Sequence, residues 1–207
     1  MKKFISFLTL PLLSVIALTL STVVNAAPTI GDAAPDFTVA DTNGNSVALS
    51  ELRGKTVVLE WTNHECPYVK KHYGSGNMQA LQSEAVSDDV VWVSVISSAQ
   101  GKQGYVDATQ ANQLSTDRKA SPSHILLDPQ GELGQLYDAR TTPHMFVISA
   151  EGQLAYMGGI DDKPTADKAD IEGANNYVRA ALSEVKEGKA VSTSTSRPYG
   201  CSVKYAT

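Results

Sequence analysis

Cysteine is scarce in this sequence: its 207 residues include two, Cys66 and Cys201. Two cysteines can form at most one disulfide, which excludes a small scaffold held together by several disulfides. The two positions are 135 residues apart. Closing a loop of that length would stabilise the folded state by about 4–5 kcal/mol in the chain-entropy model. A purely structural disulfide is therefore one hypothesis for this pair, and a redox-active pair is the other.

An excess of positive charge is also missing. The chain has 17 lysines and arginines against 22 aspartates and glutamates, so its formal net charge is −5 at pH 7. No basic cluster interrupts this mildly acidic composition, which argues against nucleic acid and anionic membrane surfaces as partners. After the N-terminal segment no apolar run is long enough to span a bilayer, so we expect no stable membrane insertion of the mature chain.

The N-terminus has the pattern of a secretory signal peptide. Two lysines precede an apolar run over residues 4–20, and small residues before Ala27 form a cleavage site. An uncleaved membrane anchor is the alternative, but Pro11 inside the run and the clear cleavage site disfavour it. We therefore predict a signal peptide over residues 1–26 and an exported mature protein, periplasmic or secreted.

The segment around which we expect the mature chain to be organised runs from Val57 to Val69. Its β-branched start belongs to a predicted buried strand over residues 56–61, and a polar turn then leads to Cys66-Pro67. Proline suits the first position of a helix, because its φ is already helical and no needed N–H is lost. The free backbone N–H groups and the helix dipole at that end favour a thiolate, so Cys66 is predicted to be a reactive nucleophile.

Further elements surround this segment. The patterns predict, in chain order, a hairpin over 37–49, a two-part helix over 68–85, a strand over 90–96, strands over 145–148 and 154–157, and a last helix over 174–185. Asn43-Gly44 supplies the turn of the first hairpin, and Asn77 is expected to cap the second part of the helix. A strand, a helix and a second apolar strand predict a right-handed βαβ unit with a parallel pair.

Two polar segments are expected to face solvent. Lys70 and Lys71 are predicted to lie on an exposed helix face. The acid-rich residues 161–170 lack the alternating oxygen ligands and central glycine of a calcium loop, so we interpret them as a solvated connection.

Four segments carry a family resemblance: residues 31–37, the pair Thr142-Pro143, residues 66–70 and residues 197–201. Together with the order of elements they resemble the thioredoxin fold. Within that fold they are similar to the redoxins of the alkyl hydroperoxide reductase/thiol-specific antioxidant type, and to an exported peroxiredoxin-like subgroup of these. The resemblance implies that Pro143 is a cis-proline facing Cys66.

The same resemblance implies an architecture. We expect an α/β domain of the thioredoxin-like kind over residues 27–190, with three α/β/α layers, a central mixed sheet and an N-terminal β-hairpin extension. Residues 191–207 would form a C-terminal tail that carries Cys201. A flexible, Ser/Thr-rich tail could bring Cys201 within the Cα–Cα reach of roughly 4.4–6.8 Å that a disulfide requires.

The sequence departs from two family motifs. Val69 occupies the second position of the Cys-x-x-Cys motif of thioredoxins, so Cys66 needs a partner elsewhere in the chain. Asn63 occupies the position where peroxiredoxins carry a threonine, and Thr62 lies one residue earlier. The hydroxyl that would orient a peroxide is therefore displaced or absent.

Several residues are candidates to assist Cys66. His64 could accept the thiol proton, His144 could approach the same sulfur, and Arg140 could supply positive charge. The candidate site thus consists of Cys66 as nucleophile and Cys201 as resolving thiol, with supporting roles for Thr62, Asn63, His64, Pro67, Pro143, His144 and Arg140.

Three functions remain open from the sequence. The first, which we favour, is an exported thiol oxidoreductase that attacks a peroxide or a disulfide, is regenerated by an external thiol reductant and needs no cofactor. The second is a copper- or zinc-binding module that uses His64, Cys66 and His144. The third is a non-catalytic redoxin-like domain that binds a partner and has its two cysteines locked in a structural disulfide.

Overall fold

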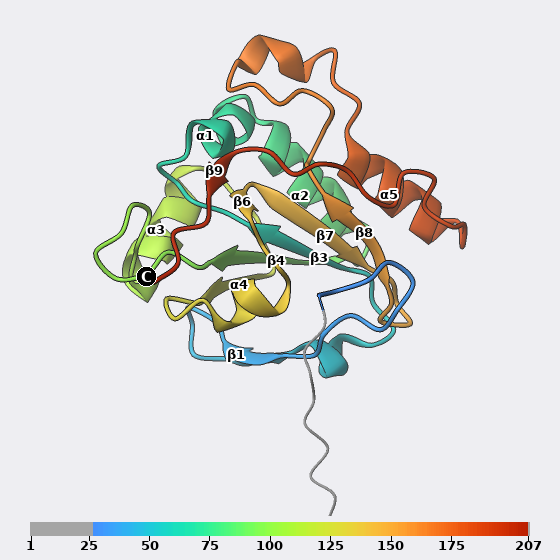
Figure 1. Cartoon of the computed structure of the whole chain (residues 1–207), viewed down its shortest axis with the longest axis horizontal. Helices are drawn as coiled ribbons and strands as arrows, with labels where there is room; N and C mark the ends of the chain where they lie inside the picture. The colour runs from blue at the N-terminus through green and yellow to red at the C-terminus, as the bar shows by residue number, and fades with distance from the viewer. Residues whose placement is uncertain (1–26, 207) are drawn as a thin grey trace, which may run out of the picture.

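The computed structural model describes residues 27–206, so the predicted signal peptide lies outside the described part. A five-stranded mixed sheet forms its centre (Figure 1). In spatial order the strands are β5 (His124–Leu127), β4 (Val91–Ile96), β3 (Val57–Trp61), β7 (His144–Ile148) and β8 (Leu154–Gly158). β3, β4 and β5 are parallel, whereas β7 and β8 run antiparallel to their neighbours. The predicted mixed sheet and its parallel βαβ unit are confirmed.

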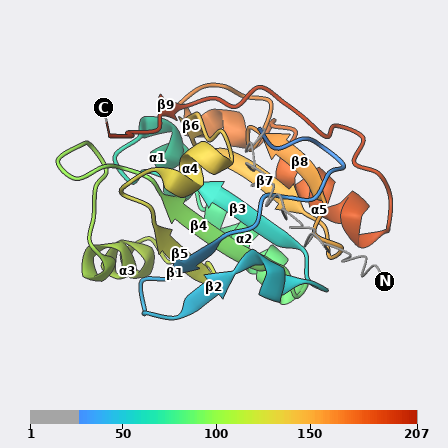
Figure 2. The same cartoon turned by 60° about the horizontal axis from the view of Figure 1, so that its bottom comes forward.

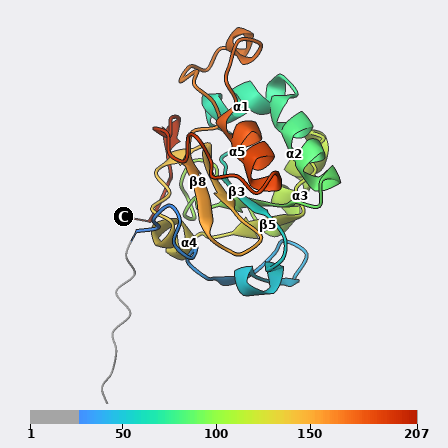
Figure 3. The same ribbon diagram turned by 90° about the vertical axis from the view of Figure 1, so that its right-hand side faces the viewer.

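Helices and a hairpin cover the two faces of this sheet. On one face lie α1 (Pro67–Gly74), α2 (Asn77–Ser87) and α5 (Tyr177–Lys186), which Figure 3 shows close together. On the other face lie α4 (Glu132–Leu136) and the hairpin of β1 (Thr38–Ala40) and β2 (Ser46–Ala48), which Figure 2 brings forward. The other helices are α3 (Ala108–Asp117), beside β5, and the short η1 (Leu49–Leu52) and η2 (Lys168–Ile171). The predicted three-layer α/β/α fold with an N-terminal hairpin is therefore correct. Within residues 27–206, none of these helices has both the length and the apolar character needed to cross a bilayer.

The first hairpin is closed by the polar turn that the sequence predicts. The Asp41 carboxylate accepts hydrogen bonds from the backbone N–H groups of Asn43 and Asn45, each at 2.9 Å. Gly44 has φ = 84°, a value that glycine adopts without a steric cost. The turn residues thus determine where the chain reverses before it enters β3.

The helix after Cys66 is divided, as expected, but its second cap differs from the prediction. Gly76 has φ = 79° and separates α1 from α2, and it is the N-cap of α2. Asn77 is instead the first helical residue, and its side-chain amide lies 2.8 Å from Nδ1 of His72. Asn77 therefore connects the two helices through side chains.

A fully buried carboxylate lies in the middle of β3. Glu60 accepts hydrogen bonds from Tyr73 Oη and Trp92 Nε1 at 2.9 Å each, and from Gln82 Nε2 and Ser94 Oγ at 3.1 Å each. A buried charge is tolerated only when its hydrogen bonds are satisfied. Glu60 thereby ties α1, α2 and β4 to the strand that leads to Cys66.

We predict that Glu60→Ala lowers the free energy of unfolding by about 3–5 kcal/mol, because several buried donors lose their acceptor. Urea denaturation measures this loss. The exposed Glu172 provides the control, and Glu172→Ala should change the free energy of unfolding by less than about 0.5 kcal/mol. A similar, small effect of both substitutions would contradict the structural role of Glu60.

Candidate active site

Cys66 lies at the start of α1 and is fully buried. It is the N-cap residue, and Pro67 takes the first helical position, as predicted. The preceding turn is held by Asn63, whose backbone carbonyl accepts from the Cys66 N–H at 3.1 Å and whose side-chain oxygen accepts from the Glu65 N–H at 2.9 Å. Asn63 also donates to the carbonyl of Gln103 at 3.2 Å. Asn63 therefore shapes the turn and fixes a neighbouring loop.

The cis-proline loop faces the sulfur. The Thr142–Pro143 peptide bond is cis, as the family resemblance implies. The backbone carbonyl of Thr142 lies 3.1 Å from Sγ of Cys66, where it accepts a hydrogen bond from the thiol. Thr142 ends the short strand β6 (Thr141–Thr142). The loop thus brings a backbone edge directly to the reactive sulfur.

The C-terminal tail occupies that backbone edge. Strand β9 (Cys201–Ser202) pairs antiparallel with β6, and Cys201 lies opposite Thr142. Gly200 allows the tail to approach Thr142 closely, because a Cβ at residue 200 would lie 2.1 Å from the Thr142 carbonyl oxygen. In Figure 1 this part of the chain is red and passes α1 on its way to β9. Strand pairing therefore positions Cys201 opposite Thr142.

We refer to residues 191–206 as the C-terminal strap. Its backbone bonds to β8 through Met157, its Ser196 hydroxyl accepts from the Gly159 N–H at 2.9 Å, and the Tyr205 hydroxyl donates to the Ala139 carbonyl at 2.7 Å. The expectation of a flexible tail is wrong, because these contacts fix the strap at points along its length. Little freedom is left to Cys201.

The two thiols perturb one another. Burial disfavours ionisation of Cys66, but hydrogen bonds from the Cys201 side chain and from the backbone of Val69 outweigh burial, so the pKa of Cys66 is lowered. The pKa of Cys201 is raised to about 11, first by burial and then by the hydrogen bond and charge of Cys66. The first thiolate to form is therefore that of Cys66, in agreement with its position at a helix start.

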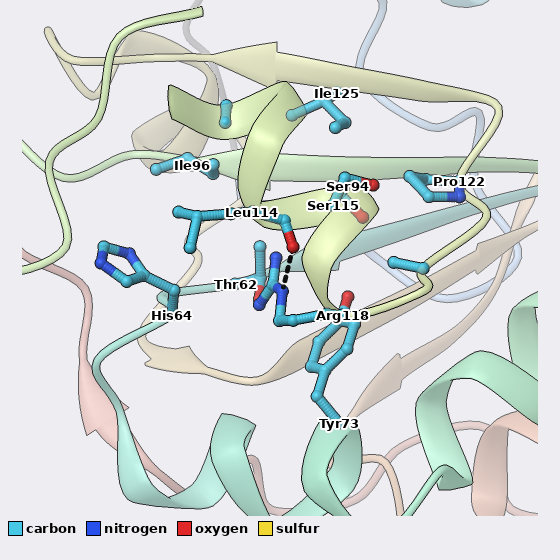
Figure 4. A pocket seen from close by; sticks show the side chains of 12 residues that line it. Thr62, His64, Tyr73, Ser94, Ile96, Leu114, Ser115, Arg118, Pro122 and Ile125 are labelled. Carbon is cyan, nitrogen blue, oxygen red and sulfur yellow. Dashed lines mark hydrogen bonds between the residues drawn. The ribbon is translucent and has the colours of Figure 1, made fainter. Parts of the chain in front are cut away.

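His64 and Thr62 are not directed at the sulfur. Both line a small cavity of about 10 Å³ together with Arg118, and Figure 4 shows His64 beside Leu114 at this cavity. Burial lowers the pKa of His64; the charge of Glu65 opposes this shift, and the charges of Arg118 and Lys70 add to it. Among the described residues, Thr62 Oγ1 is buried without a hydrogen-bond partner. Neither side chain is placed to accept a proton from Cys66.

Arg140 and His144 also lie away from the sulfur. The exposed Arg140 guanidinium pairs with Asp138. His144 packs 4.5 Å from the ring of Phe146, in the core on the opposite face of the sheet from Cys66. Burial lowers the pKa of His144 to about 4, so its imidazole is neutral at pH 7. The predicted supporting roles of these two residues at Cys66 are therefore not met by the geometry.

The ligand set of the metal hypothesis is not assembled. Over residues 27–206, no three His, Cys, Asp or Glu side chains are grouped closely enough to hold a metal ion. His64 lines the small cavity with Arg118, and His144 packs against Phe146, whereas the Cys66 sulfur contacts the Thr142 carbonyl. Convergence of the three residues was the basis of that hypothesis, and it does not occur.

Sequence reasoning missed a buried polar cluster beside the site. Lys71 and Asp161, both expected in solvent, are buried together with His72 and Tyr199. The Lys71 ammonium lies 3.9 Å from Asp161 Oδ2, and His72 Nε2 lies 3.1 Å from the Tyr199 hydroxyl. The one sequence signal for this cluster was the motif at residues 197–201, which contains Tyr199.

We predict that Cys201→Ala raises the pKa of Cys66, because the hydrogen bond from the Cys201 thiol is lost. A pH titration of the ultraviolet absorbance of the thiolate measures this change. Ser202→Ala removes a hydroxyl from the neighbouring strap residue and should leave the titration of Cys66 where it is in the unmodified protein. An unchanged or lower pKa of Cys66 in Cys201→Ala would show that the second thiol does not stabilise the thiolate.

Known proteins are similar to this chain in sequence. The model of the AhpC/TSA family matches residues 30–157, which is more than half of the chain. The thiol-disulfide oxidoreductase ResA of Bacillus subtilis (strain 168) is 28% identical over 126 residues, covering 60% of this chain and 64% of ResA. The chain therefore matches less than two thirds of the length of that relative.

Solved structures agree on the fold. An uncharacterised conserved protein from Geobacillus kaustophilus superposes with a TM-score of 0.75 at 23% identity, over 86% of this chain and 93% of that one. A Chlorobium tepidum protein assigned as thiol:disulfide interchange protein DsbE gives a TM-score of 0.54 at 24% identity, over 75% and 99% of the two chains. The match to the family model over more than half of the chain shows that the chain belongs to the AhpC/TSA family of thioredoxin-fold redoxins.

Proposed function

We propose that this chain is an exported thiol–disulfide oxidoreductase in which Cys66 and Cys201 alternate between a dithiol and a disulfide. The observation that carries the proposal is the pairing of Cys201 with Thr142 beside the Cys66 sulfur. This pairing places a second thiol next to a thiol whose pKa is lowered. The family of the chain, and the activity named for ResA, support the same chemistry.

The proposed cycle uses two exchange steps. The Cys66 thiolate attacks one sulfur of a substrate disulfide, forms a mixed disulfide and expels the first substrate thiolate. The Cys201 thiolate then attacks Cys66 Sγ, expels the second substrate thiolate and forms the Cys66–Cys201 disulfide. The substrate gains two electrons, and an external thiol reductant returns the pair to the dithiol.

The reactivity of Cys201 changes during this cycle. In the dithiol its pKa of about 11 keeps it protonated, so it does not compete with Cys66 for the substrate. Once Cys66 is bound in a mixed disulfide, Cys66 no longer carries a charge that opposes ionisation of Cys201. Burial, the first cause of the raised pKa of Cys201, remains, but the contribution of Cys66 is lost, so Cys201 ionises more readily at the step that needs it.

Disulfides fit this site better than peroxides. A peroxide needs donors that orient it at the sulfur, and Thr62, Arg140 and both nearby histidines are directed elsewhere. The group presented at Cys66 is instead a strand edge, already used by the strap, which suits an extended polypeptide. We therefore propose disulfide exchange as the principal reaction.

Thiol trapping and mass spectrometry test this function. The reduced protein is mixed with either a peptide disulfide or the same concentration of hydrogen peroxide, and is then quenched over time. We expect the peptide disulfide to form the Cys66–Cys201 bridge faster than peroxide does. Cys201→Ser should accumulate a mixed disulfide on Cys66, because the resolving step is blocked.

The control variant is Cys66→Ser, which keeps the partly exposed Cys201. It should form mixed disulfides much more slowly, because the pKa of Cys201 is high. Faster oxidation by peroxide would make the chain a thiol peroxidase. If the Cys66–Cys201 bridge resists mild reductants, it is a structural disulfide and the proposal is overturned.

Export is tested separately. If residues 1–26 are a signal peptide, the protein recovered from outside the cytoplasm should begin at Ala27. N-terminal sequencing of the full-length gene product measures this directly. An intact N-terminus in that fraction would contradict cleavage and favour an uncleaved anchor.

A further inference from the structure

We propose that Lys71, His72, Asp161 and Tyr199 form a latch that holds the C-terminal strap closed over Cys66. In this role Tyr199 is a positioning residue: it controls access to the nucleophile and delivers the resolving thiol. The inference deepens the function proposed above and rests on it for its redox consequence. Its effect on the access to Cys66 can be measured without that function.

The latch is a series of hydrogen bonds in which each group donates to the next. The side-chain amide of Asn77 lies 2.8 Å from His72 Nδ1 and can donate to it, which leaves the hydrogen of the neutral ring on Nε2. Burial first, and then the charge of Lys71, lower the pKa of His72 to about 3, so the ring is neutral at pH 7. His72 Nε2 can then donate to Tyr199, whose hydroxyl donates to Asp161 Oδ1. Each hydrogen-bond donor in this series therefore has one acceptor.

A buried ion pair lies directly beneath the tyrosine. Lys71 Nζ donates to the backbone carbonyl of Lys163 at 2.8 Å and lies 3.9 Å from Asp161 Oδ2. The same ammonium is 5.6 Å from the centroid of the Tyr199 ring. Tyr199 thus both covers the ion pair and supplies a hydrogen bond to its carboxylate. Loss of that hydrogen bond weakens the attachment of the strap, because a buried carboxylate is poorly tolerated with fewer donors.

The position of the latch connects it to the redox pair. Lys71 and His72 belong to α1, the helix that begins at Cys66. On the strap, Gly200 alone separates Tyr199 from Cys201, and it packs against the Thr142 carbonyl. The same helix therefore has the nucleophile at its start and, farther along, the two side chains that contact Tyr199. Docking of Tyr199 sets the position of Cys201.

Tyr199 also makes contacts that an ordinary surface tail lacks. Its ring packs edge-on against Tyr68 of α1, at 5.9 Å between centroids, and its side chain is buried. Cys66 is fully buried, and the strap is paired with Thr142, whose carbonyl contacts its sulfur, so we infer that substrate reaches Cys66 when this part of the strap moves aside. The stability of the latch therefore determines how often Cys66 is exposed.

Alkylation of reduced Cys66 by iodoacetamide tests the latch. For Tyr199→Phe, which removes the hydroxyl and keeps the ring, we expect Cys66 alkylation to be faster by about tenfold, because the hydrogen bonds of that hydroxyl with His72 and Asp161 no longer hold the strap. The rate is corrected for the thiolate fraction at the pH used. With a peptide disulfide, the same variant should accumulate more mixed disulfide at Cys66, because Cys201 arrives less often.

Tyr137→Phe is the matched control. Tyr137 is a buried core tyrosine outside the strap, and its hydroxyl donates to the Pro35 carbonyl at 2.6 Å. Its removal should lower the stability to urea, yet leave Cys66 alkylation as slow as in the unmodified protein. If Tyr199→Phe and Tyr137→Phe change alkylation equally, the hydroxyl of Tyr199 has only a structural role and the latch is refuted.

The two proposals fail in different ways. If the unmodified protein never forms a Cys66–Cys201 disulfide, but Tyr199→Phe still speeds alkylation selectively, the redox function fails and the latch stands. If the disulfide cycles normally and Tyr199→Phe leaves both alkylation and mixed-disulfide accumulation unchanged, the latch fails and the redox function stands.

Discussion

The pairing of β9 with β6 is the interaction on which the geometry of the site depends. Cys201 lies opposite Thr142, whose carbonyl oxygen contacts the Cys66 sulfur. A strand pairing fixes a residue in register, so it positions a thiol more precisely than a tether of the same length could. This pairing is made possible by the cis-proline loop, by Gly200 and by the contacts of the strap.

Local sequence patterns predicted the elements that present Cys66. A β-branched strand, a polar turn and Cys66-Pro67 determine their own conformation, because each signal acts over a few residues. The family resemblance added the cis-proline at Pro143. The fold class came from the same resemblance, which rests in part on the order of strands and helices. These features are confirmed in the structure.

The side chains around the site could not be predicted in the same way. A lysine on a short helix is usually exposed, and Lys71 is buried because Asp161 and the strap meet it from distant parts of the chain. His144 follows Pro143 in sequence, but alternation along β7 turns it to the opposite face of the sheet. Adjacency in sequence was therefore a poor guide to contact with the sulfur.

The separation of 135 residues between Cys66 and Cys201 has a consequence for biosynthesis. In a Cys-x-x-Cys motif, both thiols leave the ribosome almost together and can close a small ring in an unfinished chain. Here the sulfur partner is made 135 residues later, and strand pairing with Thr142 requires a folded β6. Cys66 thus remains without its intramolecular partner until residues 142 and 201 have both been made, and an oxidised Cys66–Cys201 pair would mark a molecule whose strap has docked.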